Sequence, residues 1–214
     1  METGAVEDEA AYLQARLRVG ALDPELLALA AYCGHEAAVL GADARPPGDP
    51  VLWAVGLVRW GQEACARALV ALAEVALPHF CRQYPNDPRP TQALDAARAW
   101  LESRREGSEE AAYKSNTGAL RAARKAARAA GRSESPASSL AAAWGAETSA
   151  YALQAAHAHQ QIAETPEEAE ALTREELVEA LERSATIWAE RRSHEELRAA
   201  IRGALVRWAL HSDD

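Results

Sequence analysis

The chain has 214 residues, a net charge of −9 and a pI of about 5.2. This acidic balance argues against general binding to nucleic acids or to anionic membranes, because both need a basic protein surface. No apolar run approaches the roughly 18 residues of a membrane span, and the acidic first residues lack the basic and apolar segments of a signal peptide. We therefore expect a cytoplasmic protein that binds neither membranes nor nucleic acids.

Alanine is the commonest residue, whereas the β-branched residues typical of strands are few. Because alanine is the strongest helix former, the composition predicts an all-α fold. We expect a single multi-helix domain of about eight to ten helices with antiparallel or repeat-like packing. Short N-terminal helices should cover 1–48, a central helical core 49–164, and C-terminal helices of the same domain 165–214.

Short helices are expected at the start of the chain. The first should cover residues 6–19. Asp23 and Pro24 then combine an N-cap with a proline at the first helical position, which predicts a second helix that closes at Gly34. A third, shorter helix should end at Gly41.

The next helix should be central to the fold. It begins with another Asp-Pro pair, Asp49 and Pro50, and the segment up to Tyr84 is apolar on most of its circumference. Proline lacks an amide donor and crowds the preceding turn, so we expect Pro78 to kink or end this helix.

A proline-rich corner follows at residues 85–90. Prolines push the residues before them out of the helical region, so the preceding helix should end there and a new helix should cover 90–105. Such a loop has few backbone hydrogen bonds of its own, which predicts that Asp87 and Arg89 hold it and that Trp100 packs beneath it. The predicted structural corner comprises Asp87, Arg89, Pro90, Arg98 and Trp100.

Two further helices are expected over 109–130 and 136–164. The first carries a stripe of basic residues whose spacing places them on one helical face. This face is either solvated and paired with acidic neighbours, or an anchor for an acidic partner. The possible partner-binding stripe comprises Arg121, Arg124, Lys125, Arg128 and Arg132.

Capping boxes mark the remaining helices. Each pairs a hydroxyl cap with a carboxylate that lies three residues further on, which predicts helices over 166–172, 174–191 and 194–210. The region 164–182 is rich in glutamate, which favours the dipole at helix N-termini. The alternative is an acidic patch that mimics a nucleic acid or neutralises a basic toxin. The boxes are Thr165 with Glu168, Thr173 with Glu176, and Ser193 with Glu196.

No catalytic or metal-binding set emerges from the sequence. His157 and His159 are two residues apart on a predicted helix and so point in different directions. The cysteines are odd in number and widely spaced, which fits neither a disulfide framework nor a metal site. There is no phosphate-binding loop and no nucleophile elbow. We therefore expect no catalytic residue, no cofactor, no metal and no enzymatic activity; an enzyme with an unrecognised site is the less favoured alternative.

The corner also carries a resemblance. A Leu-Pro-x-Phe segment, a Pro-x-Asp-x-Arg-Pro corner and an Ala-Arg-x-Trp helix follow one another between residues 77 and 100. In this succession residues 53–102 resemble the immunity proteins of bacterial polymorphic-toxin systems, the immunity-protein-five-like family. The resemblance implies an all-α scaffold and a toxin-neutralising role, and it identifies no catalytic residue. The matching residues are Leu77, Pro78, Phe80, Pro85, Asp87, Arg89, Pro90, Ala97, Arg98 and Trp100.

These observations favour a non-enzymatic helical protein that binds another protein. The leading hypothesis is an immunity, or antitoxin-like, protein whose partner is a toxin. The alternative is an all-α interaction or scaffold module without a toxin. The sequence leaves the oligomeric state and the binding face open.

Overall fold

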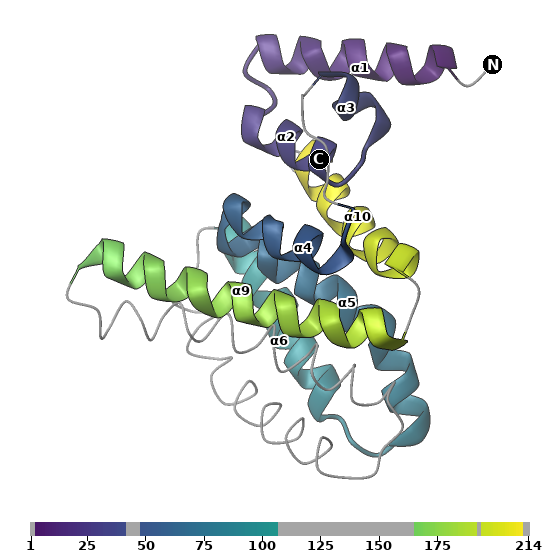
Figure 1. The fold of residues 1–214 in the computed structure, drawn as a ribbon, viewed down its shortest axis with the longest axis vertical. Coiled ribbons are helices and arrows are strands. Elements are labelled where there is room, and N and C mark those ends of the chain that lie inside the picture. Colours follow the sequence, from purple (N-terminus) through teal and green to yellow (C-terminus); the bar gives the residue numbers. More distant parts are fainter. Residues whose placement is uncertain (1–2, 42–47, 107–164, 192–193, 212–214) are drawn as a thin grey trace.

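The computed structural model describes residues 3–41, 48–106, 165–191 and 194–211. Within these ranges most residues are helical and none lies in a strand, so the predicted all-α fold is confirmed (Figure 1). The described ranges do not establish the total of eight to ten helices that was predicted for the whole chain.

The start of the chain forms three helices close to the predicted positions. The Asp23 carboxylate accepts a hydrogen bond from the Glu25 amide at 2.8 Å, so the predicted N-cap is confirmed. Gly34 has a φ of 80°, which places it in the left-handed region that favours glycine after a helix. The helices are α1 (Thr3–Arg18), α2 (Pro24–Tyr32) and α3 (Glu36–Gly41).

The long central helix predicted from residue 50 is instead divided. Asp49 caps its start as predicted and accepts from the amides of Val51 and Leu52 at 2.9 and 2.8 Å. The chain then forms a 3₁₀ helix, and a new α-helix begins at Gly61. The φ of 80° and ψ of −177° of Gly61 are incompatible with a continuous helix. The elements are α4 (Pro50–Val55), η1 (Gly56–Trp60) and α5 (Gly61–Gln83).

Pro78 lies inside α5 and does not end it, since the helix continues to Gln83. The next helix, α6 (Arg89–Glu106), follows after the short corner at residues 84–88. The predicted boundary of this helix was correct to within one residue at each end.

Two helices end the described part of the chain, α9 (Pro166–Arg191) and α10 (His194–His211). Thr165 Oγ1 accepts from the Glu168 amide at 3.2 Å, so the hydroxyl cap of the first box is confirmed. The predicted helix start at 174 is wrong. Thr173 lies inside α9, which is helical on both sides of it. Outside the described residues lie the predicted helices at 109–130 and 136–164, and with them Arg121, Arg124, Lys125, Arg128, Arg132, His157 and His159.

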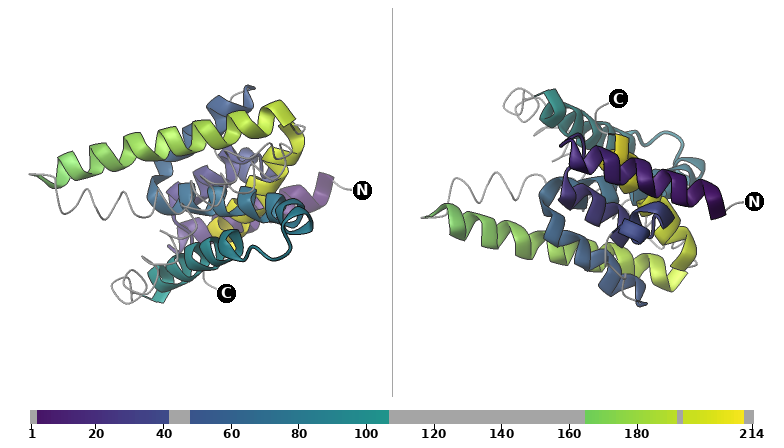
Figure 2. Two further views of the ribbon diagram at one scale, coloured as in Figure 1. Left: turned by 90° about the horizontal axis from the view of Figure 1, so that it is seen from below. Right: turned by 90° about the horizontal axis from the view of Figure 1, so that it is seen from above.

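Helix α5 is central, as its apolar sequence predicted. Residues 64–73 are all buried except Arg67, which is partly exposed. Figure 2 shows α6 and α9 on opposite sides of the molecule, and both pack against α5 together with α10. The central helix therefore contacts partners on most of its circumference.

Buried residues form two clusters. The larger joins α1–α4, η1, α5, α9 and α10, so the N-terminal, central and C-terminal segments share one apolar core. The smaller joins Ala66, Val70 and Ala73 of α5 to one side of α6. Its α6 members are Leu94, Ala97 and Leu101. Helix α6 is thus attached through its own contact with α5 and not through the main core.

Hydrogen bonds join the first helix to the last, and the last helix to the residue before the N-cap of α4. The Arg16 guanidinium of α1 donates to the carbonyl oxygens of Leu210 and Ala21, and Arg198 of α10 donates to the Gly48 carbonyl at 2.6 Å.

In the described part of the chain, no helix combines the length and apolar character needed to cross a lipid bilayer.

Candidate functional site

The proline-rich corner is held in part by its own backbone. The Asp87 amide donates to the Tyr84 carbonyl at 3.1 Å, and the Gln92 amide donates to the Pro88 carbonyl at 2.9 Å. The chain re-enters a helix at Arg89 and Pro90, in agreement with the sequence. The side chains of Arg89, Pro90 and Trp100 lie outside the described set, so their predicted roles stay predictions.

Two predicted members of the corner lie away from it along α6. At the rise of an α-helix, Arg98 and Trp100 follow Arg89 by about 13 and 16 Å. Because the side chain of Trp100 is not described, its predicted packing beneath the loop stays a prediction. The same rise separates Arg98 from Asp87, with which the sequence had grouped it.

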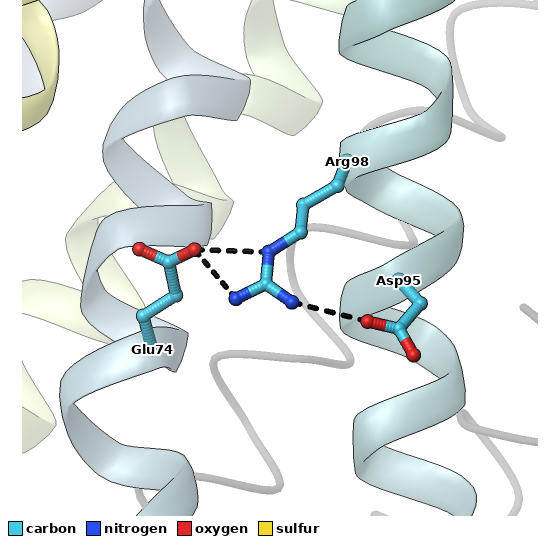
Figure 3. A network of polar contacts seen from close by, with 3 residues as sticks. All are labelled: Glu74, Asp95 and Arg98. Atoms are coloured by element: carbon cyan, nitrogen blue, oxygen red, sulfur yellow. Dashed lines mark hydrogen bonds and ion pairs between the residues drawn. The ribbon is translucent and has the colours of Figure 1, made fainter.

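Arg98 instead joins α6 to α5. Its Nε and Nη2 atoms donate to Glu74 Oε1 at 3.0 and 2.8 Å, and its Nη1 atom donates to Asp95 Oδ1 at 3.0 Å (Figure 3). The hydrogen bond with Glu74 raises the pKa of Arg98, whose guanidinium is in any case always protonated in proteins. Glu74 and Arg98 lie at equal sequence distances from the corner, which is the register of an antiparallel helix pair.

This ion pair lies at the edge of an open groove of about 510 Å³. Helices α6 and α10 both pack on α5, and the groove runs over the face of α5 between them. Its apolar surface comes from all three helices. These apolar residues are Val70 and Ala71 of α5, Leu101 of α6, and Ala204 and Trp208 of α10.

A second arginine is fixed inside the groove. Arg67 donates from Nε and Nη2 to Glu63 Oε1 at 3.1 and 2.8 Å, one turn earlier on α5. Its guanidinium carbon also lies 4.9 Å from the ring centroid of Trp208 on α10. Such a cation–π contact is attractive, and here it joins α5 to α10 across the groove.

The third arginine of the groove, Arg207, differs from the other two. It is exposed on α10 and makes no hydrogen bond or ion pair with any other residue that the structure describes. His211 lies one turn further along the same face, and Glu102 lies on the α6 side. Of the arginines that the structure describes in the groove, Arg207 is therefore the uncommitted one, whereas Arg67 and Arg98 are already neutralised by glutamates.

This groove is not predicted by the sequence alone. Its residues do carry a signal, because Ala204, Arg207, Trp208 and His211 are spaced as one face of a helix. That spacing does not indicate which helix lies opposite. The pairing of α10 with α5 is visible only in the folded structure.

Among the described residues, no group of three or more His, Cys, Asp or Glu side chains is arranged to hold a metal ion. In the groove, Glu63 and Glu74 already accept hydrogen bonds from arginines. The described arrangement is therefore one of paired charges beside an aromatic ring.

Comparisons of this chain with family models, with curated proteins and with solved structures each returned no match. The resemblance of residues 53–102 to the immunity-protein-five-like family therefore remains a hypothesis.

Proposed function

We propose that this chain is a non-catalytic protein-binding domain and that its partner is a toxin, which it neutralises as an immunity protein. The proposal takes the chain as one cytoplasmic domain of about eight to ten helices. The observation that carries the binding role is the groove between α6 and α10, and the toxin as partner rests on the corner's resemblance.

The groove has the composition of a protein contact surface. Arginine and tryptophan are enriched among the residues that dominate protein–protein binding energy, and such residues cluster in pockets near the centre of an interface. Here Arg67, Arg98 and Arg207 line the same groove as the partly buried Trp208, and Arg67 lies over its ring. The first two arginines are already held in place by Glu63 and Glu74, so a partner would meet a preorganised surface.

The test is affinity capture of the full chain from its native cell, with the captured proteins identified by mass spectrometry. A captured protein is then expressed in a sensitive cell, with and without this chain. Restored growth in the presence of the chain supports neutralisation. A specific partner that is not toxic supports the alternative, an all-α interaction or scaffold module. Conversion of a metabolite by the purified chain would contradict a non-catalytic role.

A further inference from the structure

We propose that the groove binds an acidic amphipathic segment of a protein partner, with one carboxylate paired to Arg207 and an apolar side chain packed beside Trp208. This inference rests on the proposed function and names the chemistry of the partner's contact segment.

Two of the three arginines in the groove are already paired with carboxylates. Arg67 is paired with Glu63, and Arg98 is paired with both Glu74 and Asp95. These pairs leave no net positive charge to attract a ligand. Arg207 is exposed and has no partner among the described residues, so the uncommitted charge in the groove is positive. It is complementary to a single anionic group.

An apolar surface lies beside that charge. Trp208 follows Arg207 directly on α10, and Leu101 and Val70 line the same groove from α6 and α5. An aspartate or glutamate that reached Arg207 would carry its neighbouring side chains over this surface. A segment with one carboxylate beside apolar residues on one face of a helix satisfies both parts of the groove.

The acidic residues of the groove disfavour a polyanion as its ligand. Glu63, Glu74 and Glu102 line the groove together with the arginines. A nucleic-acid strand would place successive phosphates against these carboxylates, and its binding needs several uncommitted cations. An isolated carboxylate meets one cation and avoids the remaining glutamates. The chemistry of the groove therefore fits an acidic peptide segment better than a phosphate chain.

The experiment uses the full-length chain and three capped peptides of about 15 residues, a length at which helices can begin to form. The acidic peptide carries leucines on one face and a single glutamate beside them. The neutral peptide has glutamine in place of that glutamate, and the basic peptide has lysine there. Binding is measured by calorimetry for the wild type, for Arg207→Glu and for Arg202→Glu. Arg202 is exposed on the same helix but does not line the groove, which makes it the matched control.

The wild type is expected to bind the acidic peptide at least about fivefold more tightly than the neutral one, because only the acidic peptide offers a carboxylate that can pair with Arg207. Arg207→Glu should remove this preference and bind the basic peptide instead, whereas Arg202→Glu should behave as the wild type. Circular dichroism melting checks that both variants fold.

Equal binding of the three peptides, no binding of the acidic peptide, or an unchanged preference in Arg207→Glu would overturn the inference. Such results leave the proposed function standing if a toxic partner is still captured, because the partner then uses another face. Conversely, a charge preference that depends on Arg207, without any toxin among the captured proteins, supports the inference and contradicts the immunity role.

Discussion

Tyr32 and Trp53 each donate a side-chain hydrogen bond to the backbone carbonyl of the other. The Tyr32 hydroxyl donates to the Trp53 carbonyl at 2.9 Å, and the Trp53 indole N–H donates to the Tyr32 carbonyl at 3.2 Å. Their rings are nearly parallel, with centroids 6.3 Å apart. Both side chains are buried, so each polar group needs a partner, and the exchange satisfies both while it joins α2 to α4.

Removal of the Tyr32 hydroxyl should therefore destabilise the fold. Tyr32→Phe keeps the ring but leaves the buried Trp53 carbonyl without this donor, which should lower the free energy of unfolding by about 1–3 kcal/mol. Urea denaturation measures the change. Tyr12→Phe is the control, because Tyr12 is 61% exposed and should have almost no effect. Equal stability of Tyr32→Phe and the wild type would show that the exchange contributes nothing.

The same tyrosine restricts Gly56. A Cβ atom on Gly56 would lie 2.0 Å from the Tyr32 hydroxyl oxygen, so Gly56→Ala should displace Tyr32 and cost roughly 1–3 kcal/mol, as overpacking does. The matched variant is Gly203→Ala in α10, where nothing lies within 4 Å of the added atom. It should stabilise the protein by about 0.5–1 kcal/mol, because alanine is the better helix former. Thermal melting that ranks Gly56→Ala at or above Gly203→Ala would contradict this account of the site.

The pair Glu74–Arg98 should contribute only modestly to stability. Its side chains are 43% and 49% exposed, so solvent screens the attraction, and a double-mutant cycle with Glu74→Ala and Arg98→Ala should give a coupling of about 0.2–1 kcal/mol. The coupling should fall as salt is added, since added ions screen exposed charges. A coupling that stays constant up to high salt would mean that packing, and not charge, joins these side chains.

The buried thiols should be unreactive in the folded protein. Burial raises the pKa of both Cys33 and Cys65 from 9.0 to about 12, so neither forms the reactive thiolate near neutral pH. A disulfide reagent at pH 8 should modify the partly exposed Cys81 first and the other two only on unfolding. Mass spectrometry of the peptides identifies the modified residue, and rapid labelling of Cys65 in the folded state would refute the prediction.

The same shifts predict a loss of stability in alkali. A thiol whose folded pKa lies above its unfolded value stabilises the protonated folded state, so its contribution is complete below pH 9 and is lost as the pH rises toward 12. Burial also raises the pKa of Tyr32 to about 12, which acts in the same direction. The slope approaches about 1.4 kcal/mol per pH unit for each group. The double variant Cys33→Ala, Cys65→Ala should show a shallower decline, and an identical decline would exclude the thiols as its cause.

Local signals in the sequence predicted most helix starts, because a cap acts over only a few residues. Asp23 and Asp49 bond to the amides that follow them, and Thr165 does the same. Thr173 carries the same signature yet lies inside α9. A capping box is only a local preference for a helix start. At Thr173 the packing of later turns of α9 against α4 and α5 favours a continuous helix and outweighs that preference.

The break between α4 and α5 was missed although Gly61, with a φ of 80°, is a local signal for it. The contact of Tyr32 with Gly56 and the groove depend on residues that are distant in sequence. Nothing adjacent to Gly56 indicates that the hydroxyl of Tyr32 occupies the space beside it. In the same way, Arg67 and Trp208 are brought together only when α10 packs on α5. The residues that share one face of each helix can be identified from the sequence, but the helix that packs against that face cannot.

The position of α10 also affects how this protein is made. A ribosome releases α10 after every other described helix, yet α2 and α5 both pack against it, and Arg16 donates to a carbonyl at its end. Until α10 emerges, a nascent chain carries the apolar faces of α2 and α5 without their cover. Closure of contacts so distant in sequence is slow compared with the growth of a single helix. The core is therefore completed only after α10 has left the ribosome, and during that interval the exposed faces are available to chaperones and to other nascent chains.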